Sequence, residues 1–400
     1  MDVGDDARTI GARLRQIRKS RDKSQRVVAE LAGISYSTLS RIENGLRALD
    51  RRSEIVALAK VLEISPSELT RLPVPAPADG NADSATDAVR LALMAVNHGQ
   101  PDGQVTAVDV LRARVFAMLD ARRRCDRQDQ AAATLPDLIR DVHASIAAGH
   151  DVAELLDLTV LLHTQGTSAW LRVVGAPLDL RSQATALAQQ AARERDEPIA
   201  LGIATVGSVG VMLSAGAFDP AQRALDSVTV PTTGQEATEL AGMLALSESL
   251  VAAADKQPGD VNAPLEHATE LAHRTGEGNA YWMGFGPTNV GLWHLAGAVE
   301  LGDYERAVAT AEALNPKVHP SRSRQAAYWV DYGRALARVR RRGADSVMAF
   351  RRAETISPVH LQRSPLAREV LAELLTRRAS LPDPIRRELQ GMAYRAGLPV

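Results

Sequence analysis

Apolar residues recur at helical spacing along almost the whole chain. Within residues 24–45 they form two short stripes, Val27, Val28 and Leu31 followed by Leu39 and Ile42. Ser24 and Ser35 precede these stripes, at positions where a hydroxyl caps the first turn of a helix. Gly33 lies between them, where one helix must end and the chain must turn. The pattern therefore predicts a helix, a tight turn and a second helix.

Polar side chains lie on the outer face of the second predicted helix, namely Tyr36, Ser37, Thr38 and Arg41. A helix-turn-helix can place its second helix in the major groove of DNA, where such side chains reach base edges. Candidate DNA-reading residues therefore follow Ser35 directly.

Residues 73–87, PVPAPADGNADSATD, interrupt the helical pattern. Proline ends the preceding helix, and Pro, Ala, Asp and Gly give a solvated segment without an apolar face. This composition predicts a flexible linker between an N-terminal domain, residues 1–72, and a larger second part. An ordered loop that crosses the surface is the alternative.

Helical patterns continue from residue 88 almost to the C-terminus, without strand-like alternation. Residues 88–179 are predicted as a helical connecting region. From residue 180 onward, helices pair through short turns that contain Gly216, Gly302 and Gly343. The first helices of the pairs are predicted to begin near residues 198, 237, 284, 324 and 366. Because one pair cannot bury its apolar face alone, residues 180–400 are predicted to stack as an α-solenoid, in an all-α fold.

Composition and charge fit two such parts. Of the 400 residues, 45% are hydrophobic and only 4% aromatic, which favours closely packed helices over sheets. Residues 7–72 hold 14 basic and 7 acidic side chains, whereas residues 73–400 hold 33 and 38. A basic module on a mildly acidic body is typical of a DNA reader with a large sensory part.

Secretory and membrane segments are not expected. Asp2, Asp5 and Asp6 precede any apolar run, unlike in a signal peptide, and no uninterrupted apolar run is expected to reach the roughly 18 residues of a membrane span. The single cysteine, Cys125, excludes an intrachain disulfide and fits a reducing compartment. We therefore predict a cytoplasmic protein that does not enter a membrane.

The segment ISYSTLSRIENG resembles the helix-turn-helix of the phage-repressor-like family of the Xre (Cro/C1) type. The resemblance covers roughly residues 7–72 and implies a five-helix, lambda-repressor-like domain that binds double-stranded DNA in a sequence-specific way. A first helix, IGARLRQIRKSR, precedes the pair, and two further helices follow near residues 52–62 and 65–72. The resemblance also implies an internal ion pair, Arg18 with Glu43, that braces the first helix against the third.

The same resemblance implies roles for individual residues. Gln25 matches a position that contacts a phosphate or a base, and Asn44 matches one that contacts the DNA backbone. With Arg47, which follows the recognition helix, the candidate DNA-binding residues are Gln25, Ser35, Tyr36, Ser37, Thr38, Arg41, Asn44 and Arg47. Arg51 and Arg52 are further candidates for phosphate contacts.

The helix pairs of the second part resemble tetratricopeptide (TPR) repeats, although their spacing exceeds the usual period of about 34 residues. A generic helical array is the alternative. The layout is similar to actinobacterial regulators in which an Xre-type domain precedes a TPR-like body, and to the peptide-pheromone receptors of Gram-positive bacteria. These resemblances imply a solenoid that binds a small-molecule or peptide effector. A homodimer on a palindromic operator is also expected, since one small domain rarely holds a specific DNA site at physiological salt.

Aromatic residues gather in one part of the predicted solenoid and suggest a ligand groove. Three of the four tryptophans and four of the six tyrosines lie between residues 281 and 332. The candidate groove residues are Trp282, Phe285, Asn289, Trp293, Tyr328 and Tyr332. Helix rotation decides whether Asn289 and Trp293, or instead Phe285 and His294, line such a groove. Packing of these aromatics in the core is the alternative.

No catalytic, metal or cofactor motif occurs in the sequence. The nine histidines are scattered without metal-ligand spacing, and neither a Gly-rich phosphate loop nor GxSxG is found. We therefore expect a DNA-binding transcriptional regulator that is not an enzyme and has no cofactor. The alternatives are a DNA-tethered scaffold whose solenoid binds a protein partner without a small ligand, and an antitoxin-like repressor.

Overall fold

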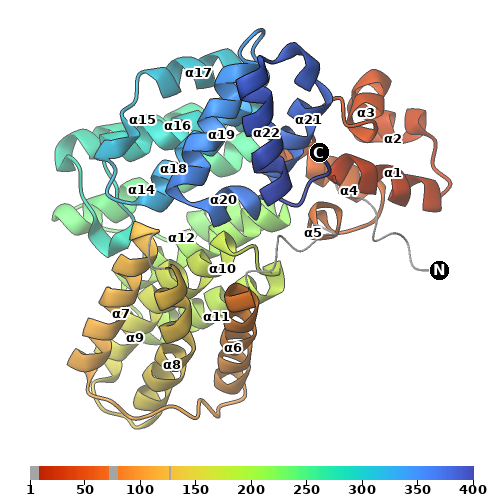
Figure 1. Ribbon diagram of the computed structural model, residues 1–400. Coiled ribbons are helices and arrows are strands. Elements are labelled where there is room, and N and C mark those ends of the chain that lie inside the picture. Colours follow the sequence, from red (N-terminus) through yellow and green to blue (C-terminus); the bar gives the residue numbers. More distant parts are fainter. Residues whose placement is uncertain (1–8, 72–79, 126–127) are drawn as a thin grey trace.

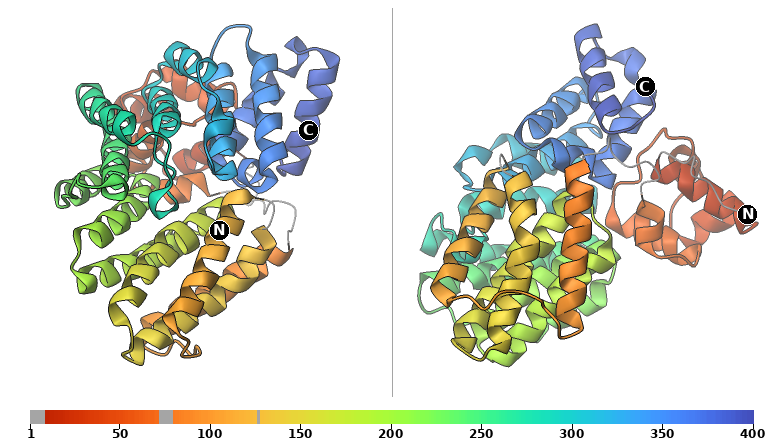
Figure 2. Two further views of the ribbon diagram at one scale, coloured as in Figure 1. Left: turned by 90° about the vertical axis from the view of Figure 1, so that its left-hand side faces the viewer. Right: turned by 60° about the horizontal axis from the view of Figure 1, so that its bottom comes forward.

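Helices make up all the regular structure of the computed structural model, which describes residues 9–71, 80–125 and 128–400 (Figure 1). Residues 9–71, here called the head, form one lobe (Figure 2). The remaining described residues form the body. The predicted all-α fold is confirmed, because a five-helix N-terminal domain precedes a long stack of helices.

Five short helices build the head: α1 (Ile10–Ser20), α2 (Gln25–Leu31), α3 (Tyr36–Glu43), α4 (Arg52–Val61) and α5 (Pro66–Thr70). The hydroxyls of Thr9, Ser24, Ser35 and Ser65 accept hydrogen bonds from the first turns of α1, α2, α3 and α5. The helices enclose an apolar core in which Leu39 is fully buried. The caps predicted at Ser24 and Ser35 are therefore confirmed.

The apolar stripe predicted in α2 is only partly buried. Val28 is 0% exposed, whereas Val27 and Leu31 are 46% and 64% exposed. The inward face of this seven-residue helix consists of Val28 and Ala29, so Val27 and Leu31, four residues apart, share the outward face. The stripe therefore predicts the helix correctly but does not identify which of its residues are buried.

Four helices begin the body: α6 (Gly80–Asn97), α7 (Val108–Arg124), α8 (Gln128–Ala147) and α9 (Val152–Leu161). They form a bundle beneath the other body helices (Figure 1), and Leu111, Val115 and Trp170 are buried in its core. After α9 the chain passes through a π-helical turn, η1 (Leu162–Ser168), into α10 (Ala169–Val173) and α11 (Leu178–Arg195).

Helix α6 changes the predicted domain boundary. It begins at Gly80, so residues 80–87 of the predicted linker are helical. Val89 and Leu93 of this helix are fully buried in the bundle core, which ties α6 to the body. A flexible linker over residues 73–87 is therefore wrong in its second half, and residues 73–79 lie outside the described residues.

Eight helices form the predicted solenoid as four pairs: α12 (Pro198–Ala215) with α13 (Phe218–Asp226), α14 (Gln235–Ala254) with α15 (Pro258–Thr275), α16 (Pro287–Leu301) with α17 (Tyr304–Glu312), and α18 (Arg322–Leu336) with α19 (Gly343–Ile356). Helices α12, α14, α16 and α18 pack against one another in sequence, and each packs against the helix that follows it. They begin close to the predicted starts, which supports a solenoid-like body. Gly216 and Gly302 end α12 and α16 with φ of +72° and +81°, but Gly343 begins α19.

The remaining elements complete the C-terminal part of the body: α20 (Pro358–Gln362), α21 (Pro365–Thr376) and α22 (Asp383–Arg395), with the short 3₁₀ turns η2 (Ala280–Trp282), η3 (Pro316–Val318) and η4 (Arg378–Ser380). Helix α22 packs against α19 and α21 and so extends the stack. The predicted helix start near residue 366 corresponds to α21.

Two body helices, α12 and α14, are long and apolar enough to span a membrane by length and composition alone. No membrane span was predicted from the sequence in either helix. Half of the apolar window of α12 and 72% of that of α14 are buried inside the fold. Helices in the core of a folded domain meet the same criterion, so the two spans are weak evidence for a membrane segment.

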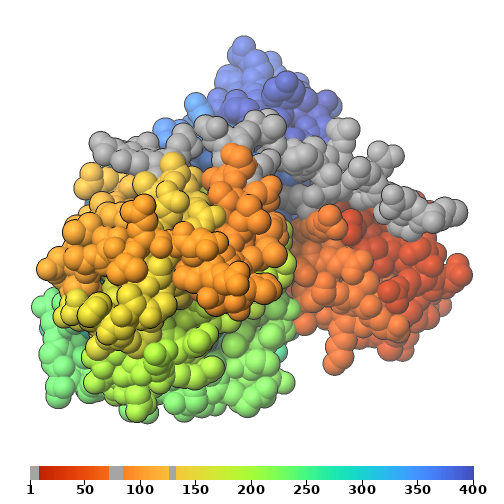
Figure 3. All heavy atoms as spheres, turned by 90° about the horizontal axis from the view of Figure 1, so that it is seen from below, coloured from red at the N-terminus to blue at the C-terminus, as the bar shows by residue number. Residues whose placement is uncertain are grey.

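The head packs directly against the body and is not held by a linker alone (Figure 3). Asp50 of the head lies between Arg334 of α18 and Arg338, which follows this helix, with its Oδ1 3.0 Å from Arg338 Nη2 and its Oδ2 3.5 Å from Arg334 Nε. Asp50 and Arg334 are 2% and 3% exposed. Arg52 forms a further ion pair with Glu300 of α16. Buried charge pairs of this kind fix one orientation of the head.

Two of the predicted turn glycines make room for the head. A Cβ on Gly216 would lie 2.3 Å from Val56 Cγ2, and one on Gly302 would lie 2.7 Å from Arg51 Nη1. The head therefore rests against the C-terminal ends of α12 and α16. The linker composition predicted a hinged, detachable head, and these contacts show a docked one instead.

Glu369 of α21 joins the head and body in a pH-dependent way. It is buried, and its Oε1 accepts a hydrogen bond from the Ile10 N–H at the start of α1. Burial raises the pKa of Glu369 to about 7, although the N–H groups of Ile10, Leu49 and Gly11 act to lower it. The folded chain thus holds this proton more tightly than the unfolded chain. The resulting stability is full below the ordinary pKa of 4.5 and is lost as the pH rises to about 7.

We expect replacement of Glu369 by Gln to remove this dependence. Between pH 6 and pH 8 the wild type should lose about 1 kcal/mol of unfolding free energy relative to the variant. The difference between the two proteins cancels other titrating groups, such as His143 and His319, whose pKa values burial lowers to about 4 and about 3. Chemical denaturation at both pH values measures the effect. Parallel pH dependence in the two proteins would contradict it.

Candidate DNA-binding surface

The turn between α2 and α3 sets the angle of the candidate recognition helix. Gly33 has φ of +67°, and a Cβ there would meet no atom within 4 Å, so backbone conformation and not space requires glycine. The Ile34 N–H donates to the Ala29 carbonyl at 3.0 Å, which closes the end of α2. Ser35 Oγ then accepts from the Thr38 N–H at 3.0 Å and starts α3.

The outer face of α3 is open to solvent. Tyr36 is 56% exposed, and Ser37 and Arg41 are exposed as well. None of the described residues forms an ion pair with Arg41, so its guanidinium is available to a ligand. Thr38 is half-buried and accepts a hydrogen bond from Ser35 Oγ at 2.9 Å. The exposed residues are of the kind that can read base edges in a major groove.

A buried network holds α3 against α1 and α2. Arg18 Nε lies 2.6 Å from Glu43 Oε1, and Arg18 Nη2 lies 2.9 Å from Glu43 Oε2, so the predicted ion pair is confirmed. The hydrogen bond with Glu43 raises the pKa of Arg18. Gln25 Nε2 donates to Glu43 Oε2 at 2.7 Å. Gln25, predicted to contact DNA, therefore braces the recognition helix in this structure.

Two other predicted contact residues also have partners within the chain. Asn44 is exposed, and its Nδ2 donates to the Ser40 carbonyl at 2.8 Å. Arg47 Nη2 lies 2.7 Å from Glu54 Oε1, a carboxylate that is 1% exposed. Arg51 pairs with the same Glu54. A count of charges cannot distinguish such inward-facing arginines from those that face a DNA backbone.

Exposed cations surround α3 on its neighbouring helices. Arg15 and Lys19 of α1 and Arg26 of α2 are exposed, and none of the described residues forms an ion pair with them. Arg26 was not among the predicted contact residues, although its place beside Gln25 at the start of α2 was a usable signal. Exposed cations of this kind can contact the phosphates of a DNA duplex.

The aromatic residues predicted to line one groove separate into different packing regions. Trp282 packs on Phe116 with ring centroids 4.3 Å apart, and its Nε1 donates to Asp120 of α7 at 3.0 Å. Phe285 is 1% exposed and lies so close to Gly242 that a Cβ there would be 2.0 Å from its Cζ. Both side chains therefore serve in the packing of the body.

Asn289, Trp293, Tyr328 and Tyr332 lie closer together but leave little space. Asn289 is fully buried and accepts a hydrogen bond from Arg324 Nη2 at 2.9 Å, and the Arg324 guanidinium lies 5.3 Å from the Trp293 ring centroid. The Tyr328 and Tyr332 hydroxyls donate to the Ala311 carbonyl and to Glu312. The cavity beside Trp293 and Tyr328 measures about 50 Å³, whereas small-molecule sites usually measure about 300–1,000 Å³. The predicted aromatic groove is absent among these described residues.

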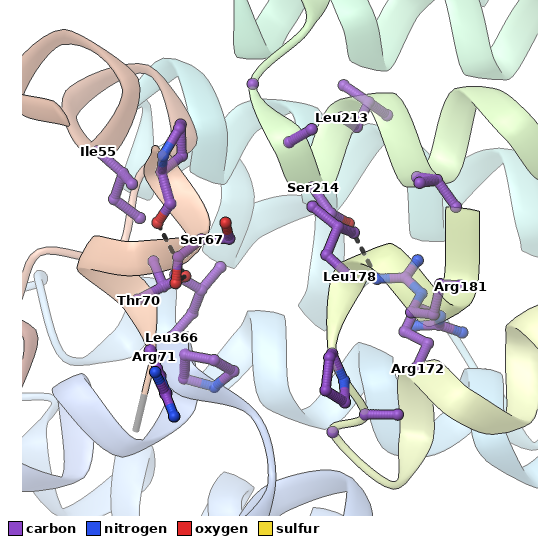
Figure 4. A pocket seen from close by; sticks show the side chains of 18 of the residues that line it. Ile55, Ser67, Thr70, Arg71, Arg172, Leu178, Arg181, Leu213, Ser214 and Leu366 are labelled. Carbon is purple, nitrogen blue, oxygen red and sulfur yellow. Dashed lines mark hydrogen bonds between the residues drawn. The ribbon is translucent and has the colours of Figure 1, made fainter. Parts of the chain in front are cut away.

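A much larger cavity lies between the head and the body. It measures about 1110 Å³, and its walls come from α4 and α5 of the head and from α10, α11, α12 and α21 of the body. Arg71, Arg172 and Arg181 are among its lining residues (Figure 4). No sequence pattern predicts this site, because the arginines are far apart in the chain and docking of the head brings them together.

A family model described as a helix-turn-helix domain matches residues 9–72. No curated protein and no solved structure matches the chain. The family match covers the head and none of the body. Residues 9–72 are thus a helix-turn-helix domain, and a domain of this kind indicates that the protein binds DNA.

Proposed function

We propose that the protein is a sequence-specific transcriptional regulator of the Xre type and not an enzyme. The observation that carries the proposal is the open outer face of α3, where Tyr36, Ser37 and Arg41 are exposed while the head is docked. Docking therefore leaves the reading surface accessible. The basic residues on α1 and α2 add phosphate contacts that hold the head on the duplex.

Rigidity of the head supports base reading. Arg18, Gln25 and Glu43 join all three helices that surround the turn through hydrogen bonds of 2.6 to 2.9 Å. A recognition helix that is already fixed loses little entropy on binding, and its side chains keep one register on the base pairs. The network thus prepares α3 for a defined sequence.

The body is proposed to act as a dimerisation and sensor part in the cytoplasm. Two heads bound to a palindromic operator must meet half-sites about 34–36 Å apart. Because buried ion pairs join each head to α16 and α18, a change within the body moves the head with it. The competing proposal is a scaffold whose solenoid binds a protein partner, and it gains support if the operator affinity responds to a partner and to no small molecule.

Replacement of Arg41 by Ala is expected to weaken operator binding by about 1–3 kcal/mol and to relax the preference at one base position. The reason is that Arg41 is exposed on α3 and its guanidinium has no partner among the described residues. In vitro selection of bound sequences with the full chain, followed by affinity measurement at fixed salt, tests it. Arg387→Ala is the matched control, since Arg387 is an exposed arginine of α22. Failure of the wild type to enrich any sequence would contradict the proposed function.

A further inference from the structure

The cavity between head and body has an unbalanced charge. Seven arginines and His360 line its walls, against two carboxylates, Glu68 and Asp179, and no lysine is among the described lining residues. Both carboxylates are exposed, and neither forms an ion pair with an arginine among the described residues. The cavity is therefore strongly cationic, although the whole chain has a net charge of −1.

Three of these arginines, Arg13, Arg52 and Arg363, already have partners within the chain. Arg52 is held by Glu300, and Arg13 Nε donates to the Glu68 carbonyl at 2.7 Å. Arg172 and Arg71 are exposed to the cavity and form no ion pair with the described residues. Figure 4 shows Arg172 and Arg181 side by side on the body wall, with Arg71 on the opposite side.

Arg368 is the most informative of the group. It is 1% exposed, and none of its three guanidinium nitrogens has a hydrogen-bond partner among the described residues. Its neighbour Glu369 is turned toward the Ile10 N–H of the head. Arg181 is 8% exposed, and among the described residues its side chain donates only to Ser214 Oγ, at 3.3 Å, which leaves its Nε unpartnered. Buried guanidinium nitrogens without a hydrogen-bond partner are costly, so a site of this kind favours an anion that accepts from them.

The pKa values of the side chains that line the cavity agree with a site that favours an anion. Burial lowers the pKa of Arg368 to about 10, and burial together with repulsion from Arg172 and Arg52 lowers that of Arg181 to about 9. Burial and then Arg172 lower the pKa of His360 to about 3. An anion in the cavity would oppose every one of these shifts.

The chemistry of the lining indicates the class of ligand. Guanidinium groups present planar forks that bind phosphate oxygens bidentately. Apolar side chains, among them Ile55, Leu178, Leu213 and Leu366, share the same walls, and the volume of about 1110 Å³ exceeds what an inorganic ion fills. The cations stand on two walls, so a matching ligand carries more than one charged group.

We propose that the head–body cavity binds a small organic molecule with two or more phosphoryl groups, which bridges Arg172, Arg181 and Arg368 of the body to the Arg71 side of the head. A ligand placed there clamps the head in its docked orientation, because it neutralises cations that repel each other across the cavity. That the ligand regulates DNA binding rests on the proposed function. The binding event itself does not depend on DNA.

Calorimetric titration of the full chain tests the site without DNA. The probes are ATP, fructose 1,6-bisphosphate, inorganic phosphate and citrate. We expect at least one of the two organic phosphates to bind at least tenfold more tightly than inorganic phosphate and citrate. No binding of either organic phosphate at about 10 mM, or tighter binding of citrate, would overturn the proposal. Displacement of the bound probe by a short DNA duplex of unrelated sequence would show that the cavity receives a DNA backbone, and would overturn it as well.

Variants separate binding from a structural role. Arg368→Met and Arg181→Met each keep an aliphatic stem and are expected to weaken the bound organic phosphate at least tenfold, whereas Arg387→Met on α22 leaves it unchanged. Without ligand, Arg368→Met should melt above the wild type, since it removes a buried guanidinium group that has no hydrogen-bond partner among the described residues. A lower melting temperature for Arg368→Met, or unchanged affinity in both variants, would overturn the site.

A third experiment tests whether the bound organic phosphate changes DNA binding. Operator affinity of the full chain is measured with and without the bound organic phosphate, and it should change for the wild type and not for Arg368→Met. If no operator sequence can be selected, the proposed function fails while the calorimetric result still stands. If the sequence is selected but no phosphate binds, only the present inference fails.

Discussion

Replacing Asp50 with Asn is expected to lower the free energy of unfolding by about 3 kcal/mol and to loosen the head from the body. Asp50 is 2% exposed and lies within 3.5 Å of Arg334 and Arg338. Burial acts to raise the pKa of Asp50, but the two arginines outweigh it, so the pKa lies below its ordinary value. The carboxylate is therefore ionised when folded, and its loss leaves two buried cations with one fewer counter-charge.

The size of the effect follows from the partners that remain. Arg334 keeps Asp331 at 2.7 Å and Arg338 keeps Glu373, which sets the loss at the lower end of the range for a broken buried pair. Hydrogen exchange should rise in residues 45–52 and in α21, since the Ala48 N–H is bonded to Glu373. The bundle of α7, α8 and α9 should keep its protection.

A surface ion pair provides the matched control for Asp50. Asp345 pairs with Arg342 at the start of α19, and its side chain is 55% exposed. Replacement of Asp345 by Asn should change the unfolding free energy by no more than about 1 kcal/mol. Similar losses in the two variants would show that the head is not held by its buried charges.

Local features of the head could be predicted from the sequence, because short-range chemistry determines them. Serine hydroxyls at Ser24 and Ser35 cap the next helix whatever lies beyond it, and Gly33 permits the left-handed turn. The helix pairs of the solenoid were predictable for the same reason, since period and turn glycines are properties of a single segment. The pairing of Arg18 with Glu43 followed from the family resemblance.

Contacts between distant segments could not be predicted. The linker composition favoured a hinged head, but Asp50 is paired with Arg334 of α18 and with Arg338 just after it, more than 280 residues away along the chain. Clustering of aromatics between residues 281 and 332 suggested a groove, but Trp282 faces α7 and Phe285 faces α14. The cationic cavity gives no local signal, because its arginines belong to separate helices. Tertiary docking decides where each of these side chains points.

The second large effect is expected for Arg18→Met, which should cost about 3–5 kcal/mol of head stability and abolish specific DNA binding. The Glu43 side chain is 1% exposed, and without Arg18 its carboxylate keeps, among the described residues, only Gln25 as a side-chain donor. An uncompensated buried charge then favours an altered or unfolded α3. Chemical denaturation should show a first transition for the head before that of the body, together with loss of operator affinity.

Two further variants decide whether Arg18 acts through the buried charge. Arg21 and Glu63 form an exposed pair at 3.4 Å, so Arg21→Met should cost less than about 1 kcal/mol and leave DNA binding intact. Adding Glu43→Gln to Arg18→Met removes the buried carboxylate that has lost its arginine. The double variant should therefore recover part of the stability, and a double-mutant cycle measures this coupling. Equal costs for Arg18→Met and Arg21→Met, or no recovery in the double variant, would mean that α3 is positioned by its apolar contacts and not by this ion pair.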